Sequence, residues 1–554
     1  MKKIFILFGC LCMLCATATA VTVTDVEGTF RGNLTIGEDN YPGKEIYILP
    51  GVESNSVTFV LPDFSYNGAP LGDIVLVNIP MSSNGRLTLE DSPLYIRAID
   101  AHVAVSMSSN SSLSASSAQV TLSIDVPDLP APIPVTFSGA RGTGNYDFVN
   151  GGFEGTWSNN EPSGWHSFGT ATGGMSSFVS GNTGQFTQQS DKRPGSTGKN
   201  SARLQSKSMF GVAANGNCTN GQINAGSMSA GDASKNYNFS DPSNSGYNTP
   251  FVGNPDSLVF WAKYIPADGD PTNSANKARA HAVITTASRY QDPESGNYSS
   301  VKVADAEINY SATSTKGWQR ISVPFKYYSV SPSQAAYMLT TFTTNANPGG
   351  GTTSGSSVDN IYLDDVEMVY NCRLSSLTMN GAAISFQNGQ ATLDAPYSDS
   401  DYLFVATSNG KAAKAFIGCS AATNQIYVYV VAHNYAQAKN YTLYTIQMAE
   451  PEDVGPDDTQ YAYSATTCDN EPYSDDLFQG LTETGVYTTT IPNVGGGDSI
   501  ITLSLSVLPS YLFTEEQSTA EQQFDWRGKH LENLEYSTEP YIFYDSLKST
   551  LGCD

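Results

Sequence analysis

Asn150-Gly-Gly-Phe-Glu-Gly155 and Asn360-Ile-Tyr-Leu-Asp-Asp-Val-Glu-Met-Val-Tyr370 enclose the segment around which the chain is organised. The first stretch predicts an opening strand with the Phe-Glu pair, and the second predicts a closing apolar strand with two aspartates. Between them, apolar runs such as Leu258-Val-Phe-Trp-Ala-Lys-Tyr264 follow long Gly-, Ser- and Asn-rich stretches. The pattern predicts a β-sandwich of the jelly-roll kind with long loops on one rim.

The composition indicates a secreted protein with several β domains. The chain has 554 residues, too many for one hydrophobic core, and charged residues make up only 15 %. Residues 1–20 are typical of a signal peptide, with Lys2 and Lys3 before an apolar run and cleavage expected after Ala20. We therefore expect a secreted, periplasmic or cell-surface location. A lipoprotein signal at Cys10 is the alternative, but that cysteine lies too early in the apolar run.

The net charge of −25 argues against nucleic acid or an anionic membrane as a partner. A neutral glycan would not be repelled. Solubility is the simpler explanation of this charge.

The rest of the chain divides into further all-β segments. Residues 21–140 alternate apolar and polar positions between short turns, which predicts a closed or nearly closed antiparallel barrel. The jelly roll is expected over 145–371 and an immunoglobulin-like sandwich over 372–450. An acidic linker is expected over 451–465, and degenerate β-repeats, the last one incomplete, over 466–554.

Several motifs carry family resemblances. Pro162-Ser-Gly-Trp165, Gly317-Trp-Gln-Arg-Ile-Ser-Val-Pro-Phe325 and Tyr362-Leu-Asp-Asp-Val366 resemble the jelly-roll family called putative carbohydrate metabolism domain (PCMD), which implies an association with glycan use. Val26-Glu-Gly-Thr-Phe-Arg-Gly-Asn-Leu-Thr-Ile36 resembles calycin-like (lipocalin-like) barrels. Such a barrel of about eight strands either holds one small apolar ligand or fills with side chains, and the absence of Trp favours filling.

Two further resemblances concern the second half of the chain. The segment after Cys372 resembles cadherin-like spacer modules, and the last segment resembles Gly-Cys-Asp-Ser surface β-repeats. Of 8 cysteines, five follow the signal peptide and show no CxxC spacing. We predict a Cys372–Cys419 disulfide. The repeat resemblance leaves Cys468 and Cys553 either unmatched or paired across units.

Aromatic side chains are the candidates for ligand contact, because they stack on the apolar face of a sugar ring. Trp157 lies in a polar stretch and is the first candidate. Trp261, Lys263 and Tyr264 follow, and Trp261 and Lys263 face outward if Phe260 faces the core. Core packing is the alternative for each tryptophan, and for Trp165 and Trp318 it is favoured.

Glu154, Asp364 and Asp365 are the metal candidates. Jelly-roll carbohydrate modules that open with Phe-Glu often join their first and last strands through calcium, which takes carboxylate and carbonyl oxygens. Adjacent aspartates on a strand point to opposite faces, so only one is expected to bind the ion. The alternatives are a structural calcium ion or solvated carboxylates at a sheet edge.

The five histidines lie in no catalytic motif, and we expect no enzyme activity. The sequence predicts a secreted, non-catalytic glycan-binding protein of the cell envelope. A structural or adhesive surface protein with cell-surface protein partners is the main alternative. A glycoside-active enzyme is the second, and it would need two carboxylates facing each other across a cleft.

Overall fold

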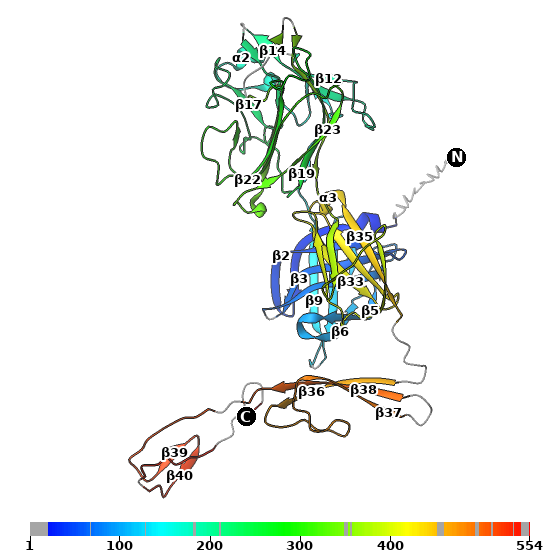
Figure 1. Ribbon diagram of the computed structural model, residues 1–554, viewed down its shortest axis with the longest axis vertical. Helices are drawn as coiled ribbons and strands as arrows, with labels where there is room; N and C mark the ends of the chain where they lie inside the picture. The colour runs from blue at the N-terminus through cyan, green and yellow to red at the C-terminus, as the bar shows by residue number, and fades with distance from the viewer. Residues whose placement is uncertain are drawn as a thin grey trace, which may run out of the picture. The chain divides into compact units, whose positions relative to one another are not determined.

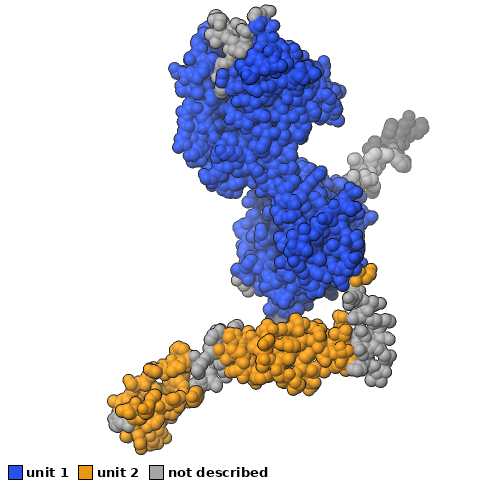
Figure 2. Space-filling model, viewed as in Figure 1, with its two compact units in different colours: residues 1–449 blue, residues 450–554 orange. Residues whose placement is uncertain are grey.

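The computed structural model describes residues 20–66, 68–127, 129–180, 184–209, 212–347, 353–354, 357–450, 459–492, 498–510, 513–535, 537–544 and 553. Within these ranges the chain is built almost entirely of β-strands in several sheets, which confirms the predicted all-β, multidomain class. It divides into two compact units, 1–449 and 450–554 (Figures 1 and 2). The predicted signal peptide lies outside the described residues except for Ala20. No helix of the described ranges is long and apolar enough to cross a membrane.

The first part of unit 1 is a nearly closed antiparallel barrel. Its strands follow the order β4-β3-β2-β1-β9-β8-β6-β5, and β7 pairs with β8. Alternate residues point inward, and their apolar side chains form one cluster that fills the interior, as predicted. The elements are α1 (Val23–Val26), β1 (Gly28–Ile36), β2 (Asp39–Pro50), β3 (Ser56–Tyr66), β4 (Ala69–Pro80), β5 (Leu89–Ile96), η1 (Arg97–Ile99), β6 (Ala101–Met107), β7 (Ser112–Leu113), β8 (Ser117–Asp125) and β9 (Ile133–Arg141).

The central part of unit 1 is a sandwich of two five-stranded sheets. One has the order β12-β13-β28-β19-β23 and the other β16-β25-β20-β22-β24. Apolar side chains from both sheets form the core between them. The strands are β12 (Phe186–Gln189), β13 (Ser201–Gln205), β16 (Asn217–Thr219), β19 (Ser257–Ile265), β20 (Ala278–Thr285), β22 (Lys302–Tyr310), β23 (Gln319–Pro324), β24 (Lys326–Tyr327), β25 (Tyr337–Thr343) and β28 (Asn360–Val369).

A third, smaller sheet of order β17-β18-β21 belongs to the same part of the chain. Strands β17 and β18 come from a stretch that the sequence predicted as a rim loop. A second apolar cluster of Val283, Tyr290 and Leu339 lies on the face of β20 and β25 that points away from the sandwich core. The remaining elements here are β10 (Trp157–Ser158), β11 (Glu161–Pro162), η2 (Phe168–Thr170), α2 (Ser176–Val179), β14 (Lys207–Met209), β15 (Val212–Ala214), β17 (Gln222–Ala225), β18 (Asn236–Phe239), β21 (Gln291–Asp292), η3 (Pro332–Gln334), β26 (Thr353–Ser354) and β27 (Ser357–Val358).

The sandwich begins and ends at the same place. The Asp147 carboxylate accepts a hydrogen bond from the Met368 backbone N–H at 2.8 Å, and the Tyr370 hydroxyl donates to the Tyr146 carbonyl at 2.6 Å. However, Phe153 and Glu154 form no opening strand. Phe153 has φ +58° and lies in a turn, with its ring buried in the core.

The last part of unit 1 is a small sandwich that packs on the barrel. Its sheets have the orders β30-β29-β32 and β31-β35-β34-β33. One apolar cluster joins barrel residues such as Tyr47 and Leu49 to Phe416 and Tyr429, and the Tyr429 hydroxyl donates to the Pro50 carbonyl at 3.0 Å. The elements are β29 (Leu374–Met379), β30 (Ala382–Ala383), β31 (Gln390–Pro396), β32 (Phe404–Ser408), β33 (Lys414–Ser420), β34 (Gln425–Val431), α3 (Tyr435–Ala438) and β35 (Tyr441–Ala449).

Unit 2 contains a three-stranded sheet of order β36-β38-β37 and a β39-β40 hairpin. Residues 459–465 belong to β36, so the linker is shorter than predicted; residues 451–458 lie outside the described ranges. A disulfide joins Cys468 to Cys553 across 85 positions. The strands are β36 (Thr459–Cys468), β37 (Gly485–Pro492), β38 (Asp498–Leu508), β39 (Phe524–Trp526) and β40 (Lys529–Leu531).

The predicted Cys372–Cys419 disulfide is wrong, because both residues are free thiols. They pack against different apolar clusters: Cys372 against the core of the central sandwich and Cys419 against that of the small one. Burial raises the pKa of the Cys419 thiol to about 12.

Candidate functional site

A pocket of about 110 Å³ lies between the β17-β18-β21 sheet and the outward face of β20 and β25. For comparison, an apolar cavity of about 150 Å³ holds one benzene ring. The pocket is therefore smaller than a cavity that encloses one ring, and a ring-sized group would enter it only in part.

Strand β20 supplies the charged part of the pocket. In Ala278-Arg-Ala-His-Ala282, alternation turns the alanines into the sandwich core and places Arg279 and His281 on the opposite face. Both side chains are buried, because the β17-β18-β21 sheet covers that face. Asp292 on β21 meets them there and is buried as well.

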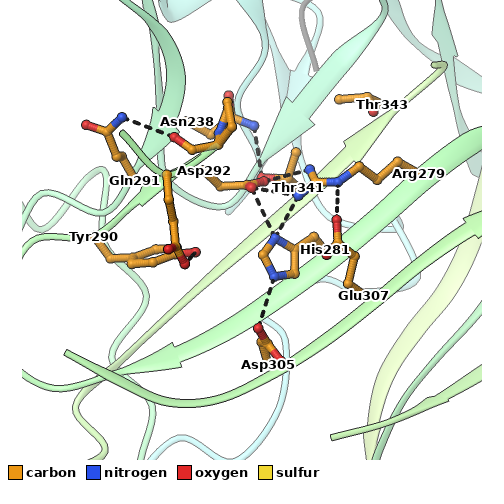
Figure 3. A network of polar contacts seen from close by, with 12 residues as sticks. Asn238, Arg279, His281, Tyr290, Gln291, Asp292, Asp305, Glu307, Thr341 and Thr343 are labelled. Carbon is orange, nitrogen blue, oxygen red and sulfur yellow. Dashed lines mark hydrogen bonds and ion pairs between the residues drawn. The ribbon is translucent and has the colours of Figure 1, made fainter. Parts of the chain in front are cut away.

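These groups form an ion network, shown in Figure 3, and Arg279 and Asp292 of this network line the pocket. Arg279 donates through Nη1 and Nη2 to the two carboxylate oxygens of Asp292, at 2.8 and 2.7 Å. Its Nε donates to Glu307 at 2.6 Å. His281 Nδ1 lies 3.0 Å from Asp292 Oδ1, and its Nε2 lies 3.8 Å from Asp305. Each of the three nitrogens of the Arg279 guanidinium thus donates a hydrogen bond to a carboxylate oxygen of this protein.

The network holds His281 in its charged form. Burial alone would lower the His281 pKa, but the Asp292 carboxylate outweighs burial and the pKa rises to about 9. The two cations in turn outweigh the burial of Asp292 and hold the pKa of that carboxyl well below its usual range. With His281 protonated, its Nδ1–H and the nearby Arg279 Nη2–H both donate to Asp292 Oδ1.

Amide side chains form the neutral polar part of the lining. Asn217 and Asn238 donate to each other's carbonyl oxygens, both at 2.9 Å, and Asn238 also donates to Thr341 at 3.0 Å. Asn215 is only 3 % exposed, and its Nδ2 has no hydrogen-bond partner. A buried donor without a partner lowers the stability of the folded state, and Asn215 Nδ2 is such a donor.

Apolar side chains form the opposite wall and the mouth. The Asn236 side chain closes the turn between β17 and β18, accepting from the Gly226 and Ser227 backbone N–H groups at 3.1 Å. Phe178 and Met228 are 54 % and 51 % exposed, which places them at the mouth. The apolar lining consists of Phe168, Met175, Phe178, Val179, Ala214, Ile223, Ala225, Met228, Ala230, Tyr237 and Pro293.

The residues that the sequence predicted for ligand contact do not line this pocket. Trp261 and Lys263 lie on β19, in the other sheet of the sandwich. The Arg193 guanidinium covers the Trp261 ring at 5.3 Å, and Lys263 forms an ion pair with Asp191 at 2.6 Å. Trp318 donates to Asp191 at 3.2 Å instead of packing in the core. This half-buried face is a separate polar and aromatic cluster.

Two other predicted contact residues belong to the core. Tyr264 is 1 % exposed, because it shares the inward face with Phe260 and Ala262, so its predicted ligand contact is wrong. Trp157 is half-buried and packs against the core, its ring 5.4 Å from Phe186. Its indole N–H donates to the Phe153 carbonyl at 3.1 Å, so it is no open stacking platform.

The three predicted metal ligands are held by hydrogen-bond donors. Glu154 accepts from the backbone N–H groups of Lys199 and Asn200, both at 2.7 Å. Asp365 accepts from Arg193 Nε at 2.5 Å, and Asp364 accepts from the Arg193 backbone N–H at 3.0 Å. Donors occupy the positions that a cation would take, and the described ranges contain no group of three or more His, Cys, Asp or Glu arranged for a metal. The residues present therefore do not fit a calcium ion.

The strand β28 also departs from the expected alternation. Val259 pairs with Glu367 and Trp261 with Asp364, so β28 has one residue more than β19 between these pairs. This extra residue makes a bulge, in which Asp365 has φ +42°. Both aspartates consequently contact Arg193 instead of pointing to opposite faces. Burial raises the pKa of Asp364 to about 6.

Comparison with known proteins gives only distant likenesses. No protein-family model and no curated protein matches the chain. A putative outer membrane protein of Bacteroides fragilis is 19 % identical over 21 % of this chain and 52 % of its own, so the chain spans about half of it, with a TM-score of 0.16. A cyclase of Fischerella sp. TAU is 13 % identical over 40 % of this chain and 93 % of its own (TM-score 0.21). A carbohydrate-binding module of the β-sandwich superfamily is 10 % identical over 61 % of this chain and 97 % of its own (TM-score 0.20).

Proposed function

We propose that the chain is a secreted, non-catalytic glycan-binding protein whose central sandwich binds one sugar residue in the pocket on β20 and β25. The observation that carries the proposal is the combination of an apolar wall with a lining of amide side chains, among them Asn217, Asn224 and Asn238. Sugar residues present C–H surfaces and oxygen acceptors side by side, so they need both kinds of lining. The volume of about 110 Å³ admits part of one glycan residue, with the rest of the residue at the mouth between Phe178 and Met228.

The charges of the pocket favour binding over cleavage. Asp292 is the one carboxylate of the described lining, and Arg279 and His281 hold it. Glycosidases use a pair of carboxylates about 5–10 Å apart, one of which gives or takes a proton. A carboxylate whose pKa is held this low is a poor proton donor.

The test is binding of the full chain to a glycan array, followed by titration calorimetry with the best ligand. Tyr237→Ala removes an aromatic side chain from the pocket lining. Trp261→Ala is the matched control in the other sheet. We expect the first variant to lose binding and the second to retain it. The reverse pattern would move the site to the Trp261 face.

A structural or adhesive role is the second candidate, and unit 2 carries the observation that favours it. Strands β36 and β37 form the two edges of their sheet, with Tyr461 and Val486 57 % and 70 % exposed. An exposed edge can accept a strand from another protein. A blank array with a folded protein would reject the glycan proposal in favour of this role.

A further inference from the structure

The outward face of the β12-β13-β28-β19-β23 sheet carries a half-buried arginine without a partner. Ala202 and Leu204 point into the sandwich core, so Arg203 between them points outward from β13. No described residue accepts a hydrogen bond from its guanidinium or forms an ion pair with it. Its Nε is enclosed by protein, whereas the two Nη atoms are not, so a ligand can reach them. This charge has lost part of its hydration without gaining an acceptor.

A tyrosine hydroxyl lies beside this guanidinium. Tyr362 is directly opposite Arg203 on β28, and its neighbours Ile361 and Leu363 belong to the core, so it points to the same outward face. The Tyr362 hydroxyl also has no hydrogen-bond partner among the described residues, and it is not enclosed. Side chains opposite each other on paired strands start about 5 Å apart. Arg203 and Tyr362 can therefore donate to one and the same group.

The carboxylates around this face are bound by other cations. Lys263 lies on the other side of Tyr362, with its Nζ 4.9 Å from the centre of the ring. The Asp191 carboxylate accepts from Lys263 at 2.6 Å and from Trp318 Nε1 at 3.2 Å. Arg203 therefore keeps a positive charge without a counter-ion, in a chain whose net charge is −25.

We infer that Arg203 and Tyr362 form a second site on the central sandwich, which binds the carboxylate or sulfate group of an acidic sugar residue. Two oxygens of that group accept from the two Nη atoms of Arg203, the fork geometry in which arginine binds oxyanions. One of these oxygens also accepts from the Tyr362 hydroxyl. That the anion belongs to a glycan rests on the proposed function, whereas the anion contact rests on this face alone.

The test compares polymers that differ only in charge, with the full chain in titration calorimetry. Polygalacturonate is paired with its methyl ester, and dextran sulfate with dextran, so the two pairs distinguish a carboxylate from a sulfate. We expect a charged polymer to bind about 10-fold or more tightly than its neutral partner, as for a hydrogen bond to a charged group. Because the net charge of −25 repels polyanions, non-specific attraction does not explain such a preference.

Three variants locate the effect. Arg203→Gln should remove the preference for the charged polymer. Tyr362→Phe keeps the ring that Lys263 covers and should weaken the charged polymer about 5-fold, the loss of one hydrogen bond; it also keeps the test open if Arg203→Gln does not fold. Arg320→Gln is the matched control, because it removes the same charge from an exposed position of β23 in the same sheet, and it should retain the preference.

Three outcomes would overturn the inference. The first is equal affinity for the charged and neutral forms of both polymers. The second is a preference that Arg203→Gln and Arg320→Gln weaken equally, which would reflect net charge alone. The third is equally tight binding of poly-glutamate, which would assign the site to a protein partner.

The two sites fail separately. Tyr237→Ala, in the pocket on the other sheet, should leave the preference for the charged polymer unchanged. Binding of charged polymers without binding of any neutral glycan would reject the proposed pocket and support the anion site. Binding of neutral glycans with no preference for charge would do the reverse.

Discussion

Titration of His281 makes the stability of the central sandwich depend on pH. Its pKa is about 9 in the folded protein and 6.5 in the unfolded chain. The folded state therefore binds the proton more tightly, and the contribution to stability is fully present below pH 6.5 and is lost as pH rises through 9. At about 1.4 kcal/mol per pH unit, the loss is about 3 kcal/mol.

The comparison that isolates this effect is between the wild-type protein and His281→Gln. Urea unfolding of the full chain is followed by tryptophan emission, because four of the five tryptophans lie in the central sandwich. The stability difference between the two proteins should shrink by about 3 kcal/mol between pH 6 and pH 10. Subtraction removes groups that titrate in both proteins, such as the thiols.

A matched control is His102→Gln, which replaces a half-exposed histidine of the barrel. That variant should follow the wild-type profile of the tryptophan-reported transition. A difference between wild type and His281→Gln that stays constant from pH 6 to pH 10 would refute the reasoning, because His281 would then be neutral in the folded state. Histidine-labelled NMR titration gives its pKa directly.

Three other predictions concern stability. Asp292→Asn leaves two buried cations without their carboxylate and should cost about 3–5 kcal/mol in urea unfolding; a loss below about 1 kcal/mol would contradict the buried network. Tyr429→Phe removes the donor to the Pro50 carbonyl at the barrel contact and should cost about 1 kcal/mol in calorimetric unfolding, whereas an unchanged transition would mean that water replaces the bond. Cys468→Ser opens the 85-residue loop closed by Cys553 and should cost unit 2 up to about 4–5 kcal/mol, seen as faster limited proteolysis; an unchanged digestion rate would contradict it.

The main strands could be predicted from the sequence because their patterns are local. The alternation in Leu258–Tyr264 predicts β19. The same alternation places Tyr264 on the face of Phe260, so the burial of Tyr264 in the core could also have been predicted. The bulge at Asp365 could not be predicted, because it depends on pairing with β19. Adjacent aspartates therefore seemed to face opposite ways.

The pocket was missed for a different reason. Its charged residues are Arg279 and His281 of β20 and Asp292 of β21. Asp292 lies beside the other two only because β21 pairs with β18. No sequence spacing shows that pairing. The alternation of Arg279 and His281 with alanines was a usable signal, since two charges on one face of an apolar strand require a partner. The Asn-rich stretch around Asn236 resembled a loop, although its amide builds the turn between two strands.

The contact between Tyr429 and the barrel has a consequence for how the chain can be divided experimentally. The barrel and the small sandwich pack on each other, although more than 220 residues of central sandwich separate them in the sequence. Both ends of that sandwich meet where Asp147 binds the Met368 backbone. The central sandwich thus lies, in the sequence, between two parts that pack on each other, and we expect a short bridge in its place to leave those two parts folded. Under the proposed function, exchange of the central sandwich would give the same two flanking parts a different ligand.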